Sequence, residues 1–195
     1  MTPPAASATL HPARAGTDVA WVPLETCAAQ APDRLLPWLC EPGLLTARVR
    51  AACGAATQFR MLRLEPAPLA SSVQCRLAIA DDVCLLREIE FSCDGMRWVF
   101  AQSVFPESTV ARYPWLRGLG ESPLGEALRR VADVEREPLE FAQLPADHEL
   151  ARAAQPAGGD ALWARRAVYR LAGAPIIVQE VFLPALGRCC GQEEP

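Results

Sequence analysis

Two charged side chains lie inside segments that are otherwise apolar, where a binding or catalytic group would stand out. Glu180 interrupts the apolar run GAPIIVQEVFLP at 173–184, and Arg87 interrupts LLREIEFSC at 85–93. Burying a lone carboxylate or guanidinium is costly unless a partner compensates its charge. The two residues therefore predict either a buried ion pair or a pocket for a charged ligand.

Alternation along the first segment places Arg87 on the apolar side of a strand. Successive side chains on a strand point to opposite faces. Arg87 therefore shares a face with core residues such as Phe91, whereas Glu88, Glu90 and Ser92 form the other face. The pattern predicts that this second face is exposed to solvent.

An Asp94-Gly95 dipeptide separates this strand from MRWVFAQSVFP. Asp-Gly between β-rich segments is a strong hairpin signal because both turn positions need positive φ. With a two-residue turn, Arg87 lies opposite Gln102. Arg87 would then share its face with three residues of the second strand, Trp98, Phe100 and Val104.

A second hairpin is predicted from LWARRAVYRL and PIIVQEVFLP, with a turn at 172–174. Both faces of its second strand are largely apolar, so Glu180 needs a partner. Arg87 is one candidate, and Arg165 or Arg166 across the hairpin are others, because the register is ambiguous by one residue. A structural ion pair and a ligand pocket both remain open.

The segment ESPLGEALRRVADV predicts a helix with Ser122 as N-cap and Pro123 at the first helical position. Leu124 and Gly125 then lie in the first turn, where unpaired backbone N–H groups attract anions. Gly125 either lets a ligand approach the backbone or packs against the sheet. Together with an inward-facing Arg87, this helix start suits a small carboxylic acid.

Strands joined by tight turns, with helices between them, predict an α+β fold: a single domain with an antiparallel sheet covered by helices. PDRLLPWLC predicts a short helix limited by Pro37, and LLTARVRAAC predicts another by its apolar spacing. QFRMLRLEP reads as a strand that ends at Pro66, and 67–82 receives no assignment.

The chain length of 195 residues fits one domain with a substantial core. We expect this domain at 21–186, after a disordered segment at 1–20 and before a flexible tail at 187–195. The net charge of −4 and the absence of a basic block disfavour nucleic acid as a partner. No secretory signal and no apolar run of roughly 18–20 residues are present, so a cytoplasmic location without membrane insertion is expected.

The eight cysteines include no C-x-x-C pair, and the two histidines, His11 and His148, lie in loop-like sequence. In a cytosolic protein this pattern predicts reduced, mostly buried thiols. It also predicts no metal site.

Four segments together resemble the bacterial chorismate pyruvate-lyases, also called 4-hydroxybenzoate synthases. They are GLLTARV at 43–49, LLREIEFSCDGMRWVFAQSVFP at 85–106, LGESPLGEAL at 119–128 and LWARRAVYRLAGAPIIVQEVFLP at 162–184, the last being the most specific. The resemblance implies a six-stranded antiparallel sheet with helices and a ligand enclosed beneath two helical flaps.

The resemblance also implies a set of site residues. The family's ligand-binding arginine falls on Arg87, its glutamate on Glu180, and its backbone contacts on Leu124 with Gly125 beside it. A flap contact that is often methionine falls on Leu45, whose lower flexibility could alter flap closure. Arg87 would hold a carboxylate, and Glu180 would be either a base or a hydrogen-bond partner.

The activity implied is conversion of chorismate to 4-hydroxybenzoate and pyruvate, the first committed step of ubiquinone biosynthesis. It needs no cofactor and no metal, and product held beneath the flaps is expected to leave slowly and inhibit. Family members are often monomeric, so a monomer is expected.

The alternative is a non-catalytic protein of the same fold that binds an aromatic acid as an effector sensor or carrier. Regulators with this fold carry a helix-turn-helix module ahead of the domain. About 25 residues precede the domain here, too few for such a module, so we expect the lyase.

Overall fold

The computed structural model describes residues 19–155 and 159–186. The expected tail at 187–195, and all but the last two residues of the expected segment at 1–20, lie outside this part of the chain. The elements are, in chain order, α1 (Leu24–Ala28), α2 (Leu36–Leu39), α3 (Leu45–Cys53), η1 (Gly54–Ala56), β1 (Thr57–Pro68), α4 (Ser71–Leu77), β2 (Val83–Cys93), β3 (Met96–Pro106), α5 (Glu107–Arg112), η2 (Pro114–Gly118), α6 (Leu124–Leu128), β4 (Val134–Arg136), β5 (Glu140–Leu144), α7 (Glu149–Ala154), β6 (Leu162–Leu171) and β7 (Ala174–Phe182).

A single antiparallel sheet organises the domain, which confirms the α+β prediction. Its strand order is β1-β2-β3-β7-β6-β4, and β5 also pairs with β6. The described sheet has seven strands rather than the expected six because β4 and β5 share one edge of β6. The β4 strand pairs with 169–171 of β6, and β5 pairs with 162–166.

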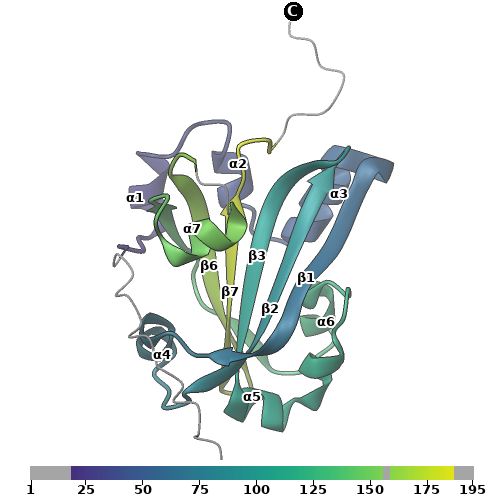
Figure 1. Cartoon of the computed structure of the whole chain (residues 1–195), viewed down its shortest axis with the longest axis vertical. Coiled ribbons are helices and arrows are strands. Elements are labelled where there is room, and N and C mark those ends of the chain that lie inside the picture. Colours follow the sequence, from purple (N-terminus) through teal and green to yellow (C-terminus); the bar gives the residue numbers. More distant parts are fainter. Residues whose placement is uncertain (1–18, 156–158, 187–195) are drawn as a thin grey trace, which may run out of the picture.

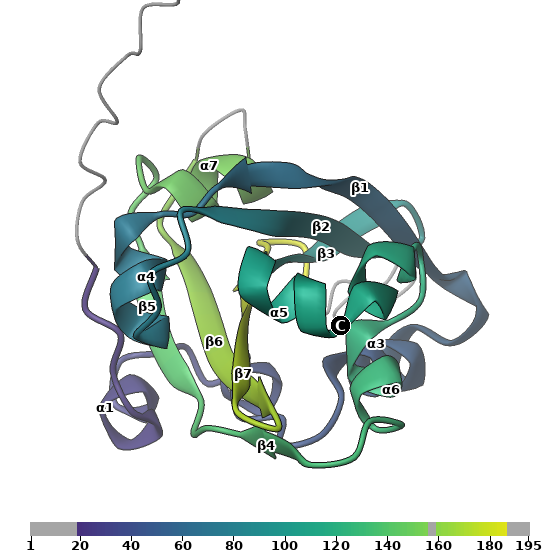
Figure 2. The same cartoon turned by 90° about the horizontal axis from the view of Figure 1, so that it is seen from below.

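Helices cover both faces of the curved sheet (Figures 1 and 2). On one face, α1 to α3 pack at one end and α5, η2 and α6 at the other. On the opposite face lie α4 and α7. This double cover explains why β7 is apolar on both sides. Within the described residues, no helix is long and apolar enough to span a bilayer.

The hairpin of β2 and β3 forms as predicted, with positive φ at Asp94 (48°) and Gly95 (76°). The predicted pairing of Arg87 with Gln102 is wrong, because the strand register shifts between Phe91 and Ser92 and Arg87 lies opposite Ser103. The shift also changes the face predicted for β3. Ala101 and Ser103 share the face of Arg87, whereas Phe100 and Val104 lie on the opposite face. Trp98 packs as predicted on the face of Arg87, against Trp38 of α2.

The prediction that Glu90 and Ser92 face solvent is also wrong. Their exposed fractions are 5% and 7%. Arg60 and Arg97 each form an ion pair with the Glu90 carboxylate at 2.6 Å, so the two guanidinium groups compensate its negative charge. A carboxylate that is paired in this way tolerates burial.

The cysteines depart from the expected reduced state at one place. A disulfide joins Cys53, at the end of α3, to Cys93, at the end of β2, across 40 residues of sequence. The proximity arises because α3 returns over the β2–β3 hairpin, which the spacing of the cysteines does not reveal. Four other cysteines are free thiols, Cys27, Cys40, Cys75 and Cys84, whereas Cys189 and Cys190 lie outside the described residues.

Candidate functional site

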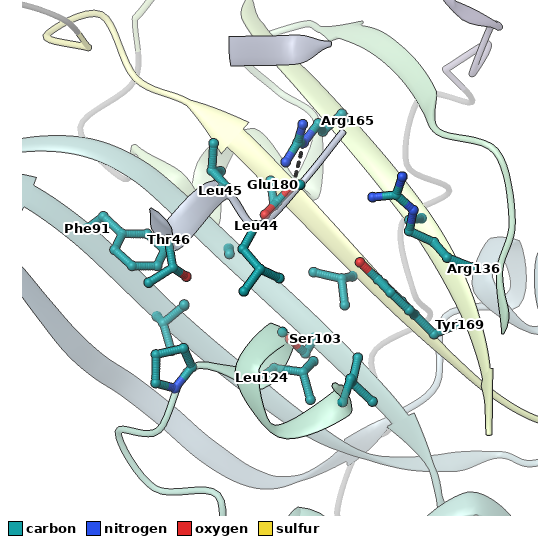
Figure 3. A pocket seen from close by; sticks show the side chains of 18 of the residues that line it. Leu44, Leu45, Thr46, Phe91, Ser103, Leu124, Arg136, Arg165, Tyr169 and Glu180 are labelled. Carbon is teal, nitrogen blue, oxygen red and sulfur yellow. Dashed lines mark hydrogen bonds and ion pairs between the residues drawn. The ribbon is translucent and has the colours of Figure 1, made fainter. Parts of the chain in front are cut away.

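A cavity lies on one face of the sheet, between the α2–α3 segment and α6 (Figure 3). Its inner part has a volume of about 60 Å³ and adjoins a wider outer cavity of about 460 Å³. The polar and charged side chains that line the inner part are Thr46, Arg87, Ser103, Arg136, Arg165, Tyr169 and Glu180. The site thus includes both residues that interrupted apolar segments.

Arg87 is a buried cation with no carboxylate partner among the described residues. Its exposed fraction is 1%. Its Nη2 donates to the carbonyl oxygens of Gly120 at 3.0 Å and Ser122 at 2.9 Å, and Nε donates to Gly120 at 3.3 Å. Burial lowers the pKa of Arg87 to about 10, so it remains charged at neutral pH. The guanidinium also lies 5.7 Å from the centre of the Phe59 ring. A buried charge held by carbonyl dipoles and a ring, without a carboxylate, provides a site for an anionic ligand.

Glu180 pairs with Arg165, which resolves the alternatives left open by the sequence. The two residues are opposite each other in the β6–β7 register, and Nε of Arg165 donates to Oε2 of Glu180 at 2.5 Å. Arg166 instead binds Glu140 at 2.8 Å. The ion pair and the pocket therefore do not exclude each other: Glu180 pairs with Arg165 and also lines the cavity.

Arg165 also connects the sheet to the segment before α3. Its Nη1 donates to the backbone carbonyls of Trp38 at 3.2 Å, Leu39 at 3.0 Å and Glu41 at 2.9 Å. The Arg165 side chain is 3% exposed. The position of the Glu180 carboxylate is therefore coupled to the backbone of the helical segment that covers it.

The predicted helix at Ser122 begins one residue later than expected. Its N-cap is Pro123, and α6 ends at Leu128. The Ser122 carbonyl instead accepts a hydrogen bond from Arg87. In the described part of the chain, the N–H groups of Leu124 and Gly125 find no backbone acceptor. Both residues line the cavity.

Leu44 rests against Gly125 where both residues line the cavity. A Cβ atom on Gly125 would overlap Cδ2 of Leu44. Figure 3 shows Leu44 reaching from the start of α3 toward α6, where Leu124 lies. Leu45, the flap residue predicted from sequence, also lines the cavity and is 4% exposed. Gly125 therefore packs against the side chain of Leu44 rather than against the sheet.

The inner cavity by itself is too small for an aromatic acid. A cavity that accommodates benzene measures about 150 Å³, more than twice the inner volume. Leu44 lines both the inner and the outer cavity. Binding of a ring in the inner part therefore requires movement of groups that line it, and Leu44 lies where the two cavities adjoin.

Sequence reasoning does not identify Ser103, Arg136 or Tyr169. The register error places Ser103 on the wrong face, and Arg136 lies on a short strand that has no sequence signal. The sequence does contain a signal for Tyr169, because it lies four residues after Arg165 on β6 and therefore points to the same face of the sheet. Burial and the charge of Glu180 both raise the pKa of Tyr169. No group of three or more His, Cys, Asp or Glu side chains arranged to hold a metal occurs in the described ranges.

Residues 16–188 match a protein-family model described as Chorismate lyase. The probable chorismate pyruvate-lyase of Azoarcus sp. (strain BH72) is 40% identical over 166 residues, covering 80% of this chain and 87% of the relative. That of Thiobacillus denitrificans (strain ATCC 25259 / T1) is 37% identical over 178 residues, covering 89% and 93%. The chorismate pyruvate-lyase of Erwinia tasmaniensis is 36% identical over 152 residues, covering 77% and 79%.

The fold itself occurs in solved structures of very different sequence. The effector domain of PhnF from Mycobacterium smegmatis superposes with a TM-score of 0.52 at 15% identity, covering 73% of this chain and 89% of that domain. The C-terminal domain of the histidine utilization repressor from Pseudomonas syringae pv. tomato gives 0.50 at 9% identity, covering 71% and 99%. At such low identity the similarity concerns the fold alone.

Proposed function

This chain belongs to the chorismate lyase family, which makes it a lyase, and we propose that it removes pyruvate from chorismate to leave 4-hydroxybenzoate. One observation carries the proposal beyond family membership. A buried guanidinium without a carboxylate partner in the described chain, Arg87, lines the same cavity as the paired carboxylate Glu180. The two suit the opposite ends of a hydroxybenzoate, one anionic and one a hydrogen-bond donor.

The reaction is an elimination that leaves an aromatic ring. The C4–H bond breaks and its electrons enter the ring, while the C3–O bond breaks and its electrons leave with the enolpyruvyl oxygen. A proton added to the enolpyruvyl methylene then gives pyruvate. The C4 hydrogen and that methylene can meet in a six-membered arrangement, so the proton can pass within the substrate. No electron acceptor is required.

Arg87 is proposed to bind the ring carboxylate, assisted by the backbone N–H groups of Leu124 and Gly125. Its charge is desolvated and its orientation is fixed by the Gly120 and Ser122 carbonyls, so binding requires little reorganisation. Catalysis by such a site rests on holding the substrate in the reactive geometry. The lowered pKa still leaves Arg87 cationic at neutral pH.

Glu180 is proposed to interact with the 4-hydroxyl group, as a hydrogen-bond acceptor or as a base. Its carboxylate is oriented by Arg165, and 18% of its side chain is exposed, so one edge of the carboxylate faces the cavity. The substrate hydroxyl would find an acceptor there whose position is set by the sheet.

Leu44 and Leu45 are proposed to act as the flap that encloses the substrate. Closure excludes water, and opening precedes release, so slow release of 4-hydroxybenzoate and inhibition by it are expected. The product is the ring precursor of ubiquinone, and we place the enzyme at the first committed step of that pathway.

The test is to incubate the purified chain with chorismate, without any added cofactor, and to measure 4-hydroxybenzoate and pyruvate by chromatography. Equal amounts of the two products support the proposal. Unchanged chorismate together with tight binding of 4-hydroxybenzoate would instead indicate a sensor or carrier of the aromatic acid.

A further inference from the structure

Arg136 lines the cavity but takes no part in holding the ring carboxylate or the 4-hydroxyl group. It ends the short strand β4 and lies opposite Tyr169 of β6. It borders both the inner and the outer cavity, so it lies where the two adjoin. Figure 3 shows Arg136 beside Tyr169 on the same wall of the pocket.

The acidic residues of this sheet edge are already bound to other arginines. Glu137 pairs with Arg76 and Arg170, and Glu140 pairs with Arg76 and Arg166. Among the residues that the structure describes, Arg136 has no carboxylate partner. Its guanidinium instead adjoins the Tyr169 hydroxyl, and burial keeps the pKa of that hydroxyl above its usual value despite the nearby cation. Arg136 is exposed to solvent, and with a neutral phenol beside it no anionic group of the described chain competes for its guanidinium, which is available to an anionic ligand.

The charges of the inner cavity match a dianion. Its charged lining consists of Arg87, Arg136, Arg165 and Glu180, so three positive charges and one negative charge give a net charge of +2. Arg165 and Glu180 neutralise each other. Two cations remain, and chorismate carries two carboxylates, one on the ring and one on the enolpyruvyl side chain.

We propose that Arg136 binds the enolpyruvyl carboxylate of the substrate, an inference that rests on the proposed function. With the ring carboxylate at Arg87, the second carboxylate lies at the boundary between the inner and outer cavities. The leaving pyruvate is then released toward the wider outer cavity. The aromatic product, which lacks this carboxylate, makes no contact with Arg136. Arg136 is thus specific for the substrate, whereas Arg87 serves substrate and product alike.

This division of roles predicts a split between substrate kinetics and product affinity. Arg136→Ala should lower kcat/KM for chorismate by about 10- to 100-fold, the value of one charge-assisted hydrogen bond. The dissociation constant of 4-hydroxybenzoate, measured by calorimetry, should change by less than about twofold, because the product does not reach Arg136. Arg136→Lys should recover part of the activity, since it retains the charge without the bidentate geometry.

Arg129→Ala is the matched control. Arg129 lines the outer cavity but not the inner one, so this variant removes an equal charge without touching the proposed contact. Kinetics close to those of the unmodified chain are expected for it. If Arg129→Ala lowers kcat/KM as much as Arg136→Ala does, a general electrostatic field explains the effect and the assignment of Arg136 is wrong.

Two further outcomes overturn the inference separately from the proposed function. If the unmodified chain converts chorismate and Arg136→Ala behaves identically, only the assignment of Arg136 fails. The assignment also fails if Arg136→Ala weakens substrate and product binding equally. If the unmodified chain does not convert chorismate, the proposed function fails and this inference fails with it.

Discussion

Glu180 and Arg165 face each other on neighbouring strands, and the guanidinium that binds the Glu180 carboxylate also binds three backbone carbonyls in the segment before α3. One side chain thus orients the carboxylate and anchors the cover of the cavity. Its removal should affect stability and activity together.

Arg165→Ala should lower the free energy of unfolding by about 3–5 kcal/mol, because it leaves a largely buried carboxylate without its partner. Urea denaturation measures this decrease. Replacing both residues by leucine, in Arg165→Leu/Glu180→Leu, should restore part of the stability because no unpaired charge remains. If Arg165→Ala is as stable as the unmodified chain, the ion pair contributes nothing to the free energy of unfolding.

Glu180→Gln distinguishes a base from a hydrogen-bond partner. Glutamine can still accept a hydrogen bond but cannot take up a proton at neutral pH. If proton transfer occurs within the substrate, kcat should fall by no more than about tenfold, the value of about one hydrogen bond. A fall of several orders of magnitude, with 4-hydroxybenzoate binding retained, would assign Glu180 as an essential base.

Arg87→Ala should lower kcat/KM for chorismate by about 100-fold or more and weaken 4-hydroxybenzoate binding in parallel, because both molecules carry the ring carboxylate. Steady-state kinetics and calorimetry measure the two effects. Arg60→Ala, which removes an arginine that pairs with Glu90, is the control and should retain activity. Unchanged kinetics in Arg87→Ala would remove this residue from the site.

Leu44→Ala should speed release of 4-hydroxybenzoate, because it removes the side chain that closes over Gly125. The dissociation rate, followed by stopped-flow fluorescence, should rise by about tenfold or more, since the truncation removes apolar area from the closed flap. Leu62→Ala, at an exposed position of the sheet edge, is the control. Equal dissociation rates in the unmodified chain and Leu44→Ala would mean that this residue does not limit release.

Cys53→Ser should destabilise the fold, because the disulfide to Cys93 closes a loop of 40 residues in the unfolded chain. Loop-closure entropy for that length corresponds to about 4 kcal/mol. Urea denaturation without reductant measures the difference, and it should vanish in dithiothreitol. Cys75→Ser, which removes an exposed free thiol, should leave stability unchanged. Equal stability of Cys53→Ser and the unmodified chain would indicate that the bond does not form in solution.

The sequence predicts the hairpins and the two central charges because these depend on local signals. The Asp94-Gly95 turn and the alternation along β7 are properties of short segments, and both appear in the structure. The position opposite Arg87 is not predictable in this way, because one extra residue in β3 moves every later pair by one position. That shift is what brings Ser103 into the site.

The remaining site residues depend on contacts between distant parts of the chain. Arg136 and Leu44 reach the cavity only once β4 pairs with β6 and the α3 segment folds over α6. The Cys53–Cys93 bond likewise follows from the packing of α3 on the hairpin. Neither short-range pattern nor residue spacing contains that information, although the resemblance to the family indicated Leu45 and Leu124 beside the cavity.

The Cys53–Cys93 bond also determines where the cover of the cavity can pivot. It fastens the C-terminal end of α3 to the sheet, while Leu45 at the other end lies over the cavity. The nine residues of α3 span roughly 13 Å, so a rotation of about 20° about Cys53 moves its first turn by roughly 5 Å. Opening can therefore proceed as a rotation of α3 about its C-terminal end, which the disulfide holds against the sheet in the open and the closed positions alike.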